Sequence, residues 1–451
     1  MLDNIKTFVK NKSVSVLGLG ISNLPLLKIL CEAECEITVR DKNELTGEAL
    51  ELIKKYNIKT ITGENYLNDI CEDIVFRSPG IMFSLPEIQS AIKNGSYVTS
   101  EMELFFEFCP AKIIGITGSD GKTTTTTVIS EILKADGKKV FLGGNIGTPL
   151  LPLLDEMNKD DFCVVELSSF QLMSMKKSPY ISVITNITPN HLDKHKDYQE
   201  YIDSKKNIML FQDNKGVFVT NASNEITKDI AKETKSLLRT FSLNNDSDIC
   251  IKNGIICYKD EEILKVSDIK LPGLYNVENF MAAIGALYGT VKNESIVKTA
   301  KNFGGVAHRV EFIRELDGVK YYNSSIDSSP NRTKNTLSVF ENKVVMISGG
   351  KDKGIPYDEI GPEIVNHVRV LILIGATAKA IEDAVIKSDK NNTVKIIHAT
   401  TYPEAVNLAK ENAKSGEAVV LSPASTSFDM FKNFEERGNL FKELVNSLWL
   451  N

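Results

Sequence analysis

The sequence lacks the features that define several large protein classes. No stretch approaches the ~18 consecutive apolar residues of a membrane-spanning helix, and the opening MLDNIKTFVK has no apolar core of a signal peptide. Proline is sparse, with 14 among 451 residues, and no fixed-period repeat or low-complexity tract is present. These absences exclude wholesale disorder, fibres and solenoids, and we expect a cytoplasmic protein without membrane insertion.

Cysteine and net positive charge are also scarce. The seven cysteines are scattered and include no C-x-x-C pair, which favours a reducing compartment over a secreted disulfide scaffold. Lysine and arginine total 53 against 59 aspartates and glutamates, a net charge of −6. Such a chain has no general attraction for nucleic acid, so we expect no nucleic-acid partner and a local site for any anionic ligand.

What the sequence does have is an alternation of short β-branched runs with helical patterns, which predicts an α/β protein with parallel sheets. At roughly 150 residues per domain, the length predicts three domains. Changes of pattern at Cys109-Pro110 and Phe303-Gly304 divide them at 1–110, 111–303 and 304–451. The predicted strands are 13–17, 36–39, 112–117, 162–166, 181–186, 321–323, 343–348, 368–374, 394–398 and 418–421.

The most informative segment is IIGITGSDGKTT at 113–124, which reads as strand, glycine-rich turn and helix. Gly118 and Gly121 let backbone N–H groups surround a phosphate, Lys122 can reach terminal phosphates, and Thr123 offers a hydroxyl to Mg²⁺. Ile116 stands where the strict phosphate-loop pattern has its first glycine. The alternative is an ordinary turn with a solvated lysine, but the strand before it and the helix after it favour nucleotide binding.

Phosphoryl chemistry also needs a carboxylate that can hold the metal. The apolar strand 162–166 ends in Glu166, at the carboxyl edge where parallel sheets bind ligands. His191 follows the strand that ends at Thr185-Asn186, so we expect a metal or phosphate role for it. The alternatives are a solvated strand-terminal glutamate and a structural or exposed histidine.

These residues belong to motifs that resemble the ATP-dependent Mur ligases of peptidoglycan synthesis. The motifs occur in the order that the family uses: TGSDGKTT (117–124), GNIG (144–147), ELSSFQL (166–172), NITPNHLDKH (186–195), LPGLYNVENFMAA (271–283), AHRVE (307–311) and LSPASTSFDMFKNFEERG (421–438). The last motif points to the members that add D-glutamate. The resemblance implies a Rossmann-like UDP-binding domain, a central ATPase-type domain with a phosphate loop, and a Rossmann-like C-terminal domain.

The resemblance also implies the reaction. ATP phosphorylates the L-alanyl carboxylate of UDP-N-acetylmuramoyl-L-alanine, and the amine of D-glutamate attacks the acyl phosphate. Two Mg²⁺ ions and a monomeric enzyme are expected. The implied ATP contacts are Gly118, Ser119, Asp120, Gly121, Lys122, Thr123, Thr124, Asn276, Asn279, Arg309 and Asp327. For the two asparagines the alternative is helix capping, and for Arg309 a surface ion pair.

By the same resemblance, Lys122, Glu166, His191 and Lys205 are the catalytic residues, and Thr123, Glu166, His191 and Lys205 hold the metals. Lys205 matches a lysine that the family carries as a carbamate. Reaction with CO₂ turns a repelling ammonium into an anionic oxygen ligand. The alternatives are a solvated helix lysine and a register shifted by one, to Lys206.

The remaining implied contacts concern the other substrates. Those for the UDP substrate are Gly20, Ile21, Ser22, Asp41, Ser78 and Asn145, and those for D-glutamate are Lys353, Ser427 and Phe434. The chain departs from the family at residues 323–330, NSSIDSSP, where relatives that add glutamate commonly show NDSKATN. Ungapped alignment puts Ser324 at the aspartate; Asp327 could replace it if the loop is longer, but Ser329 then stands at the lysine.

Three other functions remain open from sequence. The chain could be another amino-acid-adding ligase of the pathway or resemble folylpolyglutamate synthase. It could be an oxidoreductase with two Rossmann-like domains, for which Gly18-Leu19-Gly20 is the evidence, but Lys122-Thr123 then has no purpose. It could also be a nucleotide-switched binding protein.

Overall fold

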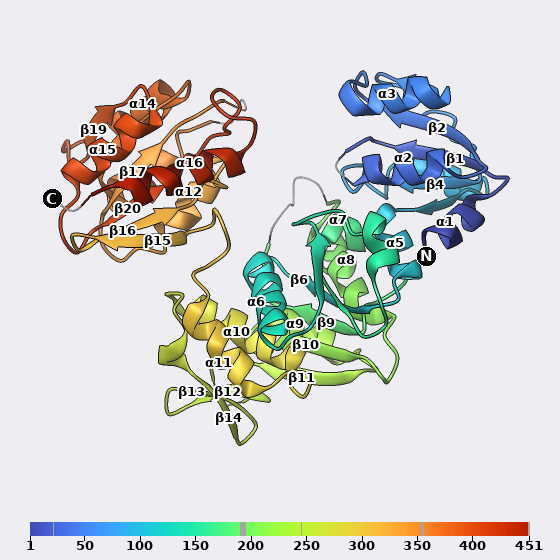
Figure 1. Cartoon of the computed structure of the whole chain (residues 1–451), viewed down its shortest axis with the longest axis horizontal. Coiled ribbons are helices and arrows are strands. Elements are labelled where there is room, and N and C mark those ends of the chain that lie inside the picture. The colour runs from blue at the N-terminus through green and yellow to red at the C-terminus, as the bar shows by residue number, and fades with distance from the viewer. Residues whose placement is uncertain (21, 190–194, 245, 353–355, 450–451) are drawn as a thin grey trace. The chain divides into compact units, whose positions relative to one another are not determined.

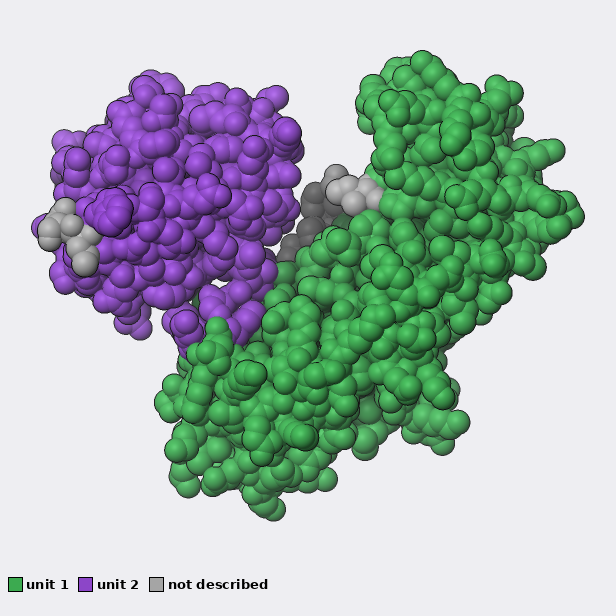
Figure 2. Space-filling model, in the orientation of Figure 1, with its two compact units in different colours: residues 1–269, 274–302 green, residues 270–273, 303–451 purple. Residues whose placement is uncertain are grey.

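The computed structural model describes residues 1–20, 22–189, 195–244, 246–352 and 356–449. The chain divides into two compact units (Figure 2). Unit 1 comprises residues 1–269 and 274–302, and unit 2 comprises residues 270–273 and 303–451. None of the described helices is both long and apolar enough to cross a membrane.

The first sheet of unit 1 is parallel, with the strand order β3-β2-β1-β4-β5. Its strands are β1 Ser13–Leu17, β2 Glu36–Asp41, β3 Lys59–Thr62, β4 Ile74–Arg77 and β5 Tyr97–Thr99. Its helices are α1 Leu2–Val9, α2 Asn23–Cys31, α3 Gly47–Tyr56, α4 Pro86–Lys93 and α5 Glu101–Phe108. The strand order reverses direction between β1 and β4, and ligands bind at such a switch point, outside the carboxyl ends of the strands.

The second sheet of unit 1 has the order β14-β13-β12-β11-β10-β9-β6-β8-β7. Its strands are β6 Lys112–Thr117, β7 Val140–Gly144, β8 Phe162–Glu166, β9 Ile181–Ile184, β10 Val217–Asn221, β11 Leu237–Phe241, β12 Ile249–Lys252, β13 Ile255–Tyr258 and β14 Glu261–Lys265. Its helices are α6 Lys122–Ala135, η1 Leu151–Glu156, α7 Ser169–Leu172, α8 Tyr198–Leu210, α9 Glu225–Ala231, η2 Val266–Asp268, α10 Leu274–Leu287 and α11 Asn293–Asn302. Helix α6 packs beside α10 and α11 (Figure 1).

One hydrophobic cluster runs through both sheets of unit 1. It joins Phe105 and Phe106 of α5 to Leu151 and Leu154 of η1, and it includes Cys163 of β8. Burial of large apolar side chains contributes about 1.5–3 kcal/mol each, so this cluster stabilises both sheets as one body.

Unit 2 is a six-stranded sheet in the order β15-β16-β20-β17-β18-β19, parallel except for the pair β15 and β16. Its strands are β15 Glu311–Leu316, β16 Val319–Asn323, β17 Val344–Ser348, β18 Val368–Leu373, β19 Lys395–His398 and β20 Ala418–Leu421. Its helices are α12 Pro330–Leu337, α13 Ile360–His367, α14 Ala378–Ser388, α15 Tyr402–Asn412 and α16 Phe434–Ser447. Successive residues of β17 enter different apolar clusters, because the strand is covered on both faces.

The predicted α/β class and its ten strands are confirmed, with end shifts such as the end of β9 at Ile184. The hairpins β12–β13 and β15–β16 were not predicted. Each turns at a two-residue sequence, Asn253-Gly254 or Asp317-Gly318, in which both residues have positive φ angles. This is the turn chemistry that matches the twist of antiparallel strands.

Candidate functional site

The turn between β6 and α6 is held in place by the end of β9. The N–H of Ser119 donates to the carbonyl of Asn186 at 2.9 Å, and the N–H of Asp120 donates to the side-chain oxygen of Asn186 at 2.9 Å. The hydroxyl of Thr185 donates to the Asp120 carbonyl at 2.5 Å. Gly118 and Gly121 have φ angles of 149° and 77°, which other residues rarely adopt. The result is an ordered loop at the N-terminus of α6, where anions bind.

Lys122, Thr123 and Thr124 begin α6 and are half-buried. The ammonium of Lys122 donates to the Ser119 carbonyl at 2.8 Å, so it curls back over the loop. The Ser119 hydroxyl also lies 2.9 Å from the hydroxyl of Tyr201, a buried residue of α8. Sequence analysis did not predict a role for Tyr201.

Asn279 of α10 lies beside this loop, and both Asn279 and its neighbour Asn276 are buried. The side-chain oxygen of Asn279 accepts from the Thr125 hydroxyl at 3.1 Å, and its amide donates to Asn276 at 3.2 Å. A Cβ atom on Gly121 would collide with that oxygen. A pocket of about 130 Å³ opens here, lined by Asp120, Gly121, Thr185, Asn186, Asn221, Phe241, Tyr275, Glu278 and Asn279.

Glu166 ends β8 and is buried, with 1% of its surface exposed. Its Oε1 accepts from the Asn145 amide at 2.9 Å, whereas its Oε2 has no hydrogen-bond partner among the described residues. The Asn145 N–H donates to the Glu166 carbonyl at 2.8 Å. Gly144 lies so close to the same carbonyl that a Cβ atom at this position would collide with it. Burying a carboxylate oxygen without a partner costs folding free energy, and a bound cation would provide that partner. The residues present therefore fit a Mg²⁺ ligand at this position.

Lys205 of α8 points at the same loop, and only 2% of it is exposed. Its Nζ donates to the Gly118 carbonyl at 2.8 Å and to the Thr117 hydroxyl at 3.3 Å. Burial, and then the neighbouring Lys122, hold the pKa of Lys205 well below its usual range, although Glu166 and Asp120 oppose this. Lys206, in contrast, forms an ion pair with Glu233 at the surface.

His191 lies outside the described residues. Another histidine of the same motif, His195, is buried and lies 2.9 Å from the Ser169 hydroxyl and 3.3 Å from Glu200. Its ring stacks on Phe170, with the ring centroids 4.9 Å apart. The motifs at 166–172 and 186–195 therefore contact each other through a residue that sequence analysis did not select.

Among the predicted UDP contacts, Gly20, Ser22, Asp41 and Ser78 lie at the switch point of the first sheet. The Leu19 N–H donates to the Asp41 carboxylate at 2.8 Å, and the Ser78 N–H donates to the Leu17 carbonyl at 3.0 Å. These bonds bring the carboxyl ends of β2 and β4 to the loop that contains Gly20 and Ser22. Ile21 lies outside the described residues. Asn145 directly follows β7 of the second sheet and lies beside Glu166.

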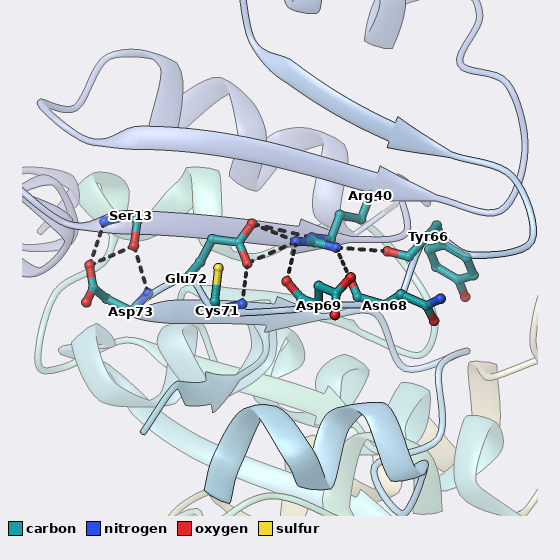
Figure 3. Close-up of polar contacts among 8 residues, drawn as sticks. All are labelled: Ser13, Arg40, Tyr66, Asn68, Asp69, Cys71, Glu72 and Asp73. Carbon is teal, nitrogen blue, oxygen red and sulfur yellow. Dashed lines mark hydrogen bonds and ion pairs between the residues drawn. The ribbon is translucent and has the colours of Figure 1, made fainter. Parts of the chain in front are cut away.

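Arg40, the neighbour of Asp41, anchors the end of β2 (Figure 3). Its guanidinium forms a buried ion pair with Glu72, 3.1 Å between Nη2 and Oε1. It also donates to the carbonyls of Tyr66, Asn68 and Asp69. Because these partners fix the strand end, the Asp41 carboxylate is held against the loop.

Arg77 connects the two sheets of unit 1 and was not predicted. It is 1% exposed, and its Nη1 donates to the Ile81 carbonyl of the loop that follows Ser78. Its Nη2 donates to the Phe170 carbonyl at 3.0 Å and to the Ser174 hydroxyl at 3.2 Å. Arg77 therefore links the predicted UDP loop to the segment that follows Glu166.

In unit 2, Arg309 is exposed, whereas Asp327 is buried. The Asp327 carboxylate accepts from the Ser422 hydroxyl at 2.7 Å, and burial raises the pKa of Asp327. Ser324, which occupies the ungapped aspartate position, is buried beside Thr336, with 3.1 Å between the hydroxyls. Asp327 thus faces inward within unit 2.

The predicted D-glutamate contacts also lie in unit 2. Lys353 lies outside the described residues, Ser427 is buried, and Phe434 begins α16. The buried guanidinium of Arg437 donates to the Ser325 hydroxyl at 3.0 Å and to the Thr426 carbonyl at 3.1 Å, and Ser325 donates to the Phe434 carbonyl at 2.8 Å. Arg437 therefore ties the segments of Ser427 and Phe434 together.

Comparison with known proteins matches all three sheets to domains of one family. The MurD-like N-terminal domain of Mur ligases matches residues 12–100, the Mur ligase middle domain residues 116–287, and the Mur ligase glutamate ligase domain residues 308–425. The UDP-N-acetylmuramoylalanine–D-glutamate ligase of Ruminiclostridium cellulolyticum is 50% identical over 99% of both chains. The protein of that name from Clostridium acetobutylicum is 46% identical over 98% of both chains.

Solved structures show the same fold at lower identity. The UDP-N-acetylmuramate-alanine ligase of Thermotoga maritima has a TM-score of 0.57 at 17% identity and covers 97% of this chain and 100% of its own. The MurF ligase of Thermotoga maritima in complex with ADP has a TM-score of 0.56 at 14% identity, covering 98% and 96%.

Proposed function

This chain belongs to the Mur ligase family, and we propose that it joins D-glutamate to UDP-N-acetylmuramoyl-L-alanine at the expense of ATP. The observation that carries the substrate assignment is the 50% identity to a D-glutamate ligase over 99% of both chains. The proposed reaction has two steps. The L-alanyl carboxylate takes the γ-phosphoryl group of ATP, and the D-glutamate amine then displaces phosphate to form the amide.

In the first step the L-alanyl carboxylate must approach the phosphates of ATP. All these groups are anionic, so the chain has to supply positive charge and backbone donors. The loop 117–124 at the N-terminus of α6 is proposed to receive the phosphates, with Lys122 turning from the Ser119 carbonyl to the terminal phosphates. Asn279 lies beside Gly121 and donates to Asn276, and both asparagines are proposed to border the nucleotide. Arg309 and Asp327 of unit 2 are proposed as further nucleotide contacts.

Glu166 and Thr123 are proposed to hold a first Mg²⁺, since Glu166 Oε2 is buried without a partner among the described residues. When bound, Mg²⁺ neutralises phosphate oxygens and stabilises charge on the transferring phosphoryl group. His191 and Lys205 are proposed as ligands of a second Mg²⁺. A protonated Lys205 would repel it.

We propose that Lys205 is carbamylated. Its amine nitrogen bonds to the carbon of CO₂ and loses a proton, which leaves an anionic oxygen ligand. The position of Nζ supports this modification, because it lies 2.8 Å from the Gly118 carbonyl of the phosphate loop. The modification has a readout independent of turnover: carbon-13 NMR of protein equilibrated with labelled bicarbonate should show a carbamate signal that Lys205→Ala abolishes.

The other proposed contacts follow the same family match. Gly20, Ile21, Ser22, Asp41 and Ser78 are proposed for the UDP group, and Asn145 for the muramoyl part. Lys353, Ser427 and Phe434 are proposed for D-glutamate. We propose a monomer that acts in the cytoplasm, and light scattering of the purified chain tests the monomer.

The deciding experiment is phosphate release from ATP with UDP-N-acetylmuramoyl-L-alanine, with and without D-glutamate. Release that requires both substrates is expected. Dependence instead on L-alanine, a diamino acid, or tetrahydrofolate with L-glutamate would move the chain to another ligase. Nucleotide-dependent binding without any ligation would contradict the enzymatic proposal.

A further inference from the structure

Two cysteines from different parts of unit 1 contact each other at strand β8 of the second sheet. Cys109 directly follows α5, in the connection between the sheets, and Cys163 lies within β8. Their sulfur atoms are 3.6 Å apart. The sulfur of Met157 lies 3.9 Å from that of Cys109 and 3.5 Å from that of Cys163. All seven cysteines of the chain are described, and all are free thiols.

We propose that Cys109 and Cys163 form a reversible redox pair, which a hydroperoxide converts to an intramolecular disulfide. The contact is already close: the two sulfurs need to approach by about 1.6 Å to reach the ~2.0 Å of a disulfide. The bond would tie the connection between the two sheets to the strand that ends at Glu166. The proposal is independent of the ligase activity.

The exposure of the two thiols decides which one the peroxide oxidises first. Cys109 is partly exposed, so a small peroxide can reach it, whereas Cys163 is fully buried. The hydrogen bond with the Cys163 thiol lowers the pKa of Cys109, although burial opposes it. The same hydrogen bond and burial raise the pKa of Cys163. Cys109 is therefore the thiol that is oxidised first, and Cys163 is the one that resolves the product.

In the first step the Cys109 thiolate attacks one oxygen of the hydroperoxide. The O–O bond breaks, a sulfenic acid forms, and the departing oxygen takes a proton to become water or an alcohol. The Cys163 sulfur then attacks the Cys109 sulfur and loses its proton, and the hydroxyl leaves as water. Two electrons pass from the two thiols to the peroxide, and a dithiol reductant reverses the change.

The other cysteines provide an internal comparison. Cys250 and Cys257 are opposite each other on β12 and β13, but both are buried, so peroxide reaches neither directly. Cys31 and Cys35 are four residues apart, and burial raises the pKa of both, that of Cys35 to about 11. Peroxide oxidation should therefore produce the 109–163 disulfide ahead of the other two pairings.

The test is peptide mapping of the reduced full-length chain after treatment with a small molar excess of hydrogen peroxide. The expected product is a cross-linked peptide pair containing Cys109 and Cys163, which dithiothreitol separates. Cys163→Ser should accumulate a sulfenic acid on Cys109 that dimedone captures. Cys250→Ser is the matched control and should form the 109–163 bond in undiminished yield.

Two results would overturn the proposal. One is a wild-type map in which Cys109 stays reduced while Cys71, which is exposed, is oxidised. The other is a predominant disulfide between any other pair. Because both readings come from the unsubstituted chain, they do not depend on whether a variant folds.

Discussion

The ammonium of Lys205 donates a 2.8 Å hydrogen bond to the carbonyl of Gly118, so a buried lysine of α8 contacts the predicted phosphate loop. The adjacent Lys206 pairs with Glu233 at the surface instead. Two neighbouring lysines of one helix therefore differ in burial and in partner, and this difference supplies a matched pair of substitutions.

Lys205→Ala should lower turnover by at least about 100-fold, because it removes a proposed metal ligand from the reaction centre. High bicarbonate should not restore activity. Lys206→Ala should retain near-parental turnover, since an exposed ion pair contributes little. Phosphate-release kinetics of both variants make the comparison, and near-normal turnover of Lys205→Ala would remove this residue from the site.

Glu166→Gln should also lower turnover by about 100-fold or more and raise the Mg²⁺ concentration needed for half-maximal activity. The substitution keeps an oxygen that can accept the Asn145 hydrogen bond but removes the negative charge. Magnesium titrations of the parent and variant test it. An unchanged magnesium requirement would exclude Glu166 as a ligand.

Gly121→Ala should weaken ATP binding, because its Cβ atom would collide with the side-chain oxygen of Asn279. Gly137→Ala is the control: both glycines have a φ angle of 77°, but at Gly137 no atom lies near the added carbon. The two variants share the backbone strain, roughly 1 kcal/mol, so any additional loss at position 121 reports on the loop. Calorimetric ATP titration measures it, and equal affinities would contradict the role of this contact.

Arg77→Met should destabilise unit 1 by about 3 kcal/mol, because it leaves the Ile81 and Phe170 carbonyls without their buried donor. Lys177→Met, which breaks a surface pair with Glu107, should cost less than about 1 kcal/mol. Urea unfolding measures both, and similar midpoints for the two variants would show that Arg77 does not hold the sheets together.

Glu101→Gln should change how stability depends on pH. Burial raises the pKa of Glu101 from 4.5 to about 7, so between these values the folded chain keeps a proton that the unfolded chain has released. The parent's stability therefore falls as pH rises through this range, by up to about 3 kcal/mol, and the glutamine variant should lack this loss. Unfolding at pH 4.5 and pH 7.5 tests it, with Glu107→Gln, an exposed position on the same helix, as the control.

Predicted strands such as β8 and β18 have continuous apolar runs, because parallel strands covered on both faces admit little else. The runs of β4 and β10 are similar, but these two strands were not predicted. The hairpin β12–β13 was not predicted because each of its strands has only four residues. The turn signal was available, however: Asn253-Gly254 is the dipeptide that such hairpins use.

The polar residues at strand ends, such as Glu166 and Asp41, could be selected from sequence because parallel strands present their carboxyl ends at one edge. Arg77 could not, since an arginine after Ile74-Val75-Phe76 looks like an ordinary solvated strand end. Its burial follows from packing between two sheets, which one-dimensional patterns do not contain. The roles of the selected residues in binding and catalysis stay predictions.

The apolar cluster that α5 shares with η1 limits how the chain can be rearranged. Phe105 and Phe106 pack with Leu151 and Leu154 across the junction at residue 110. Cutting the chain there would expose an apolar surface on each half, and such surfaces promote aggregation. A chimaera that exchanges the first sheet for that of a relative must import the matching face of η1 as well. Residues 303–451 are therefore the better candidate for such an exchange, because they belong to a separate compact unit.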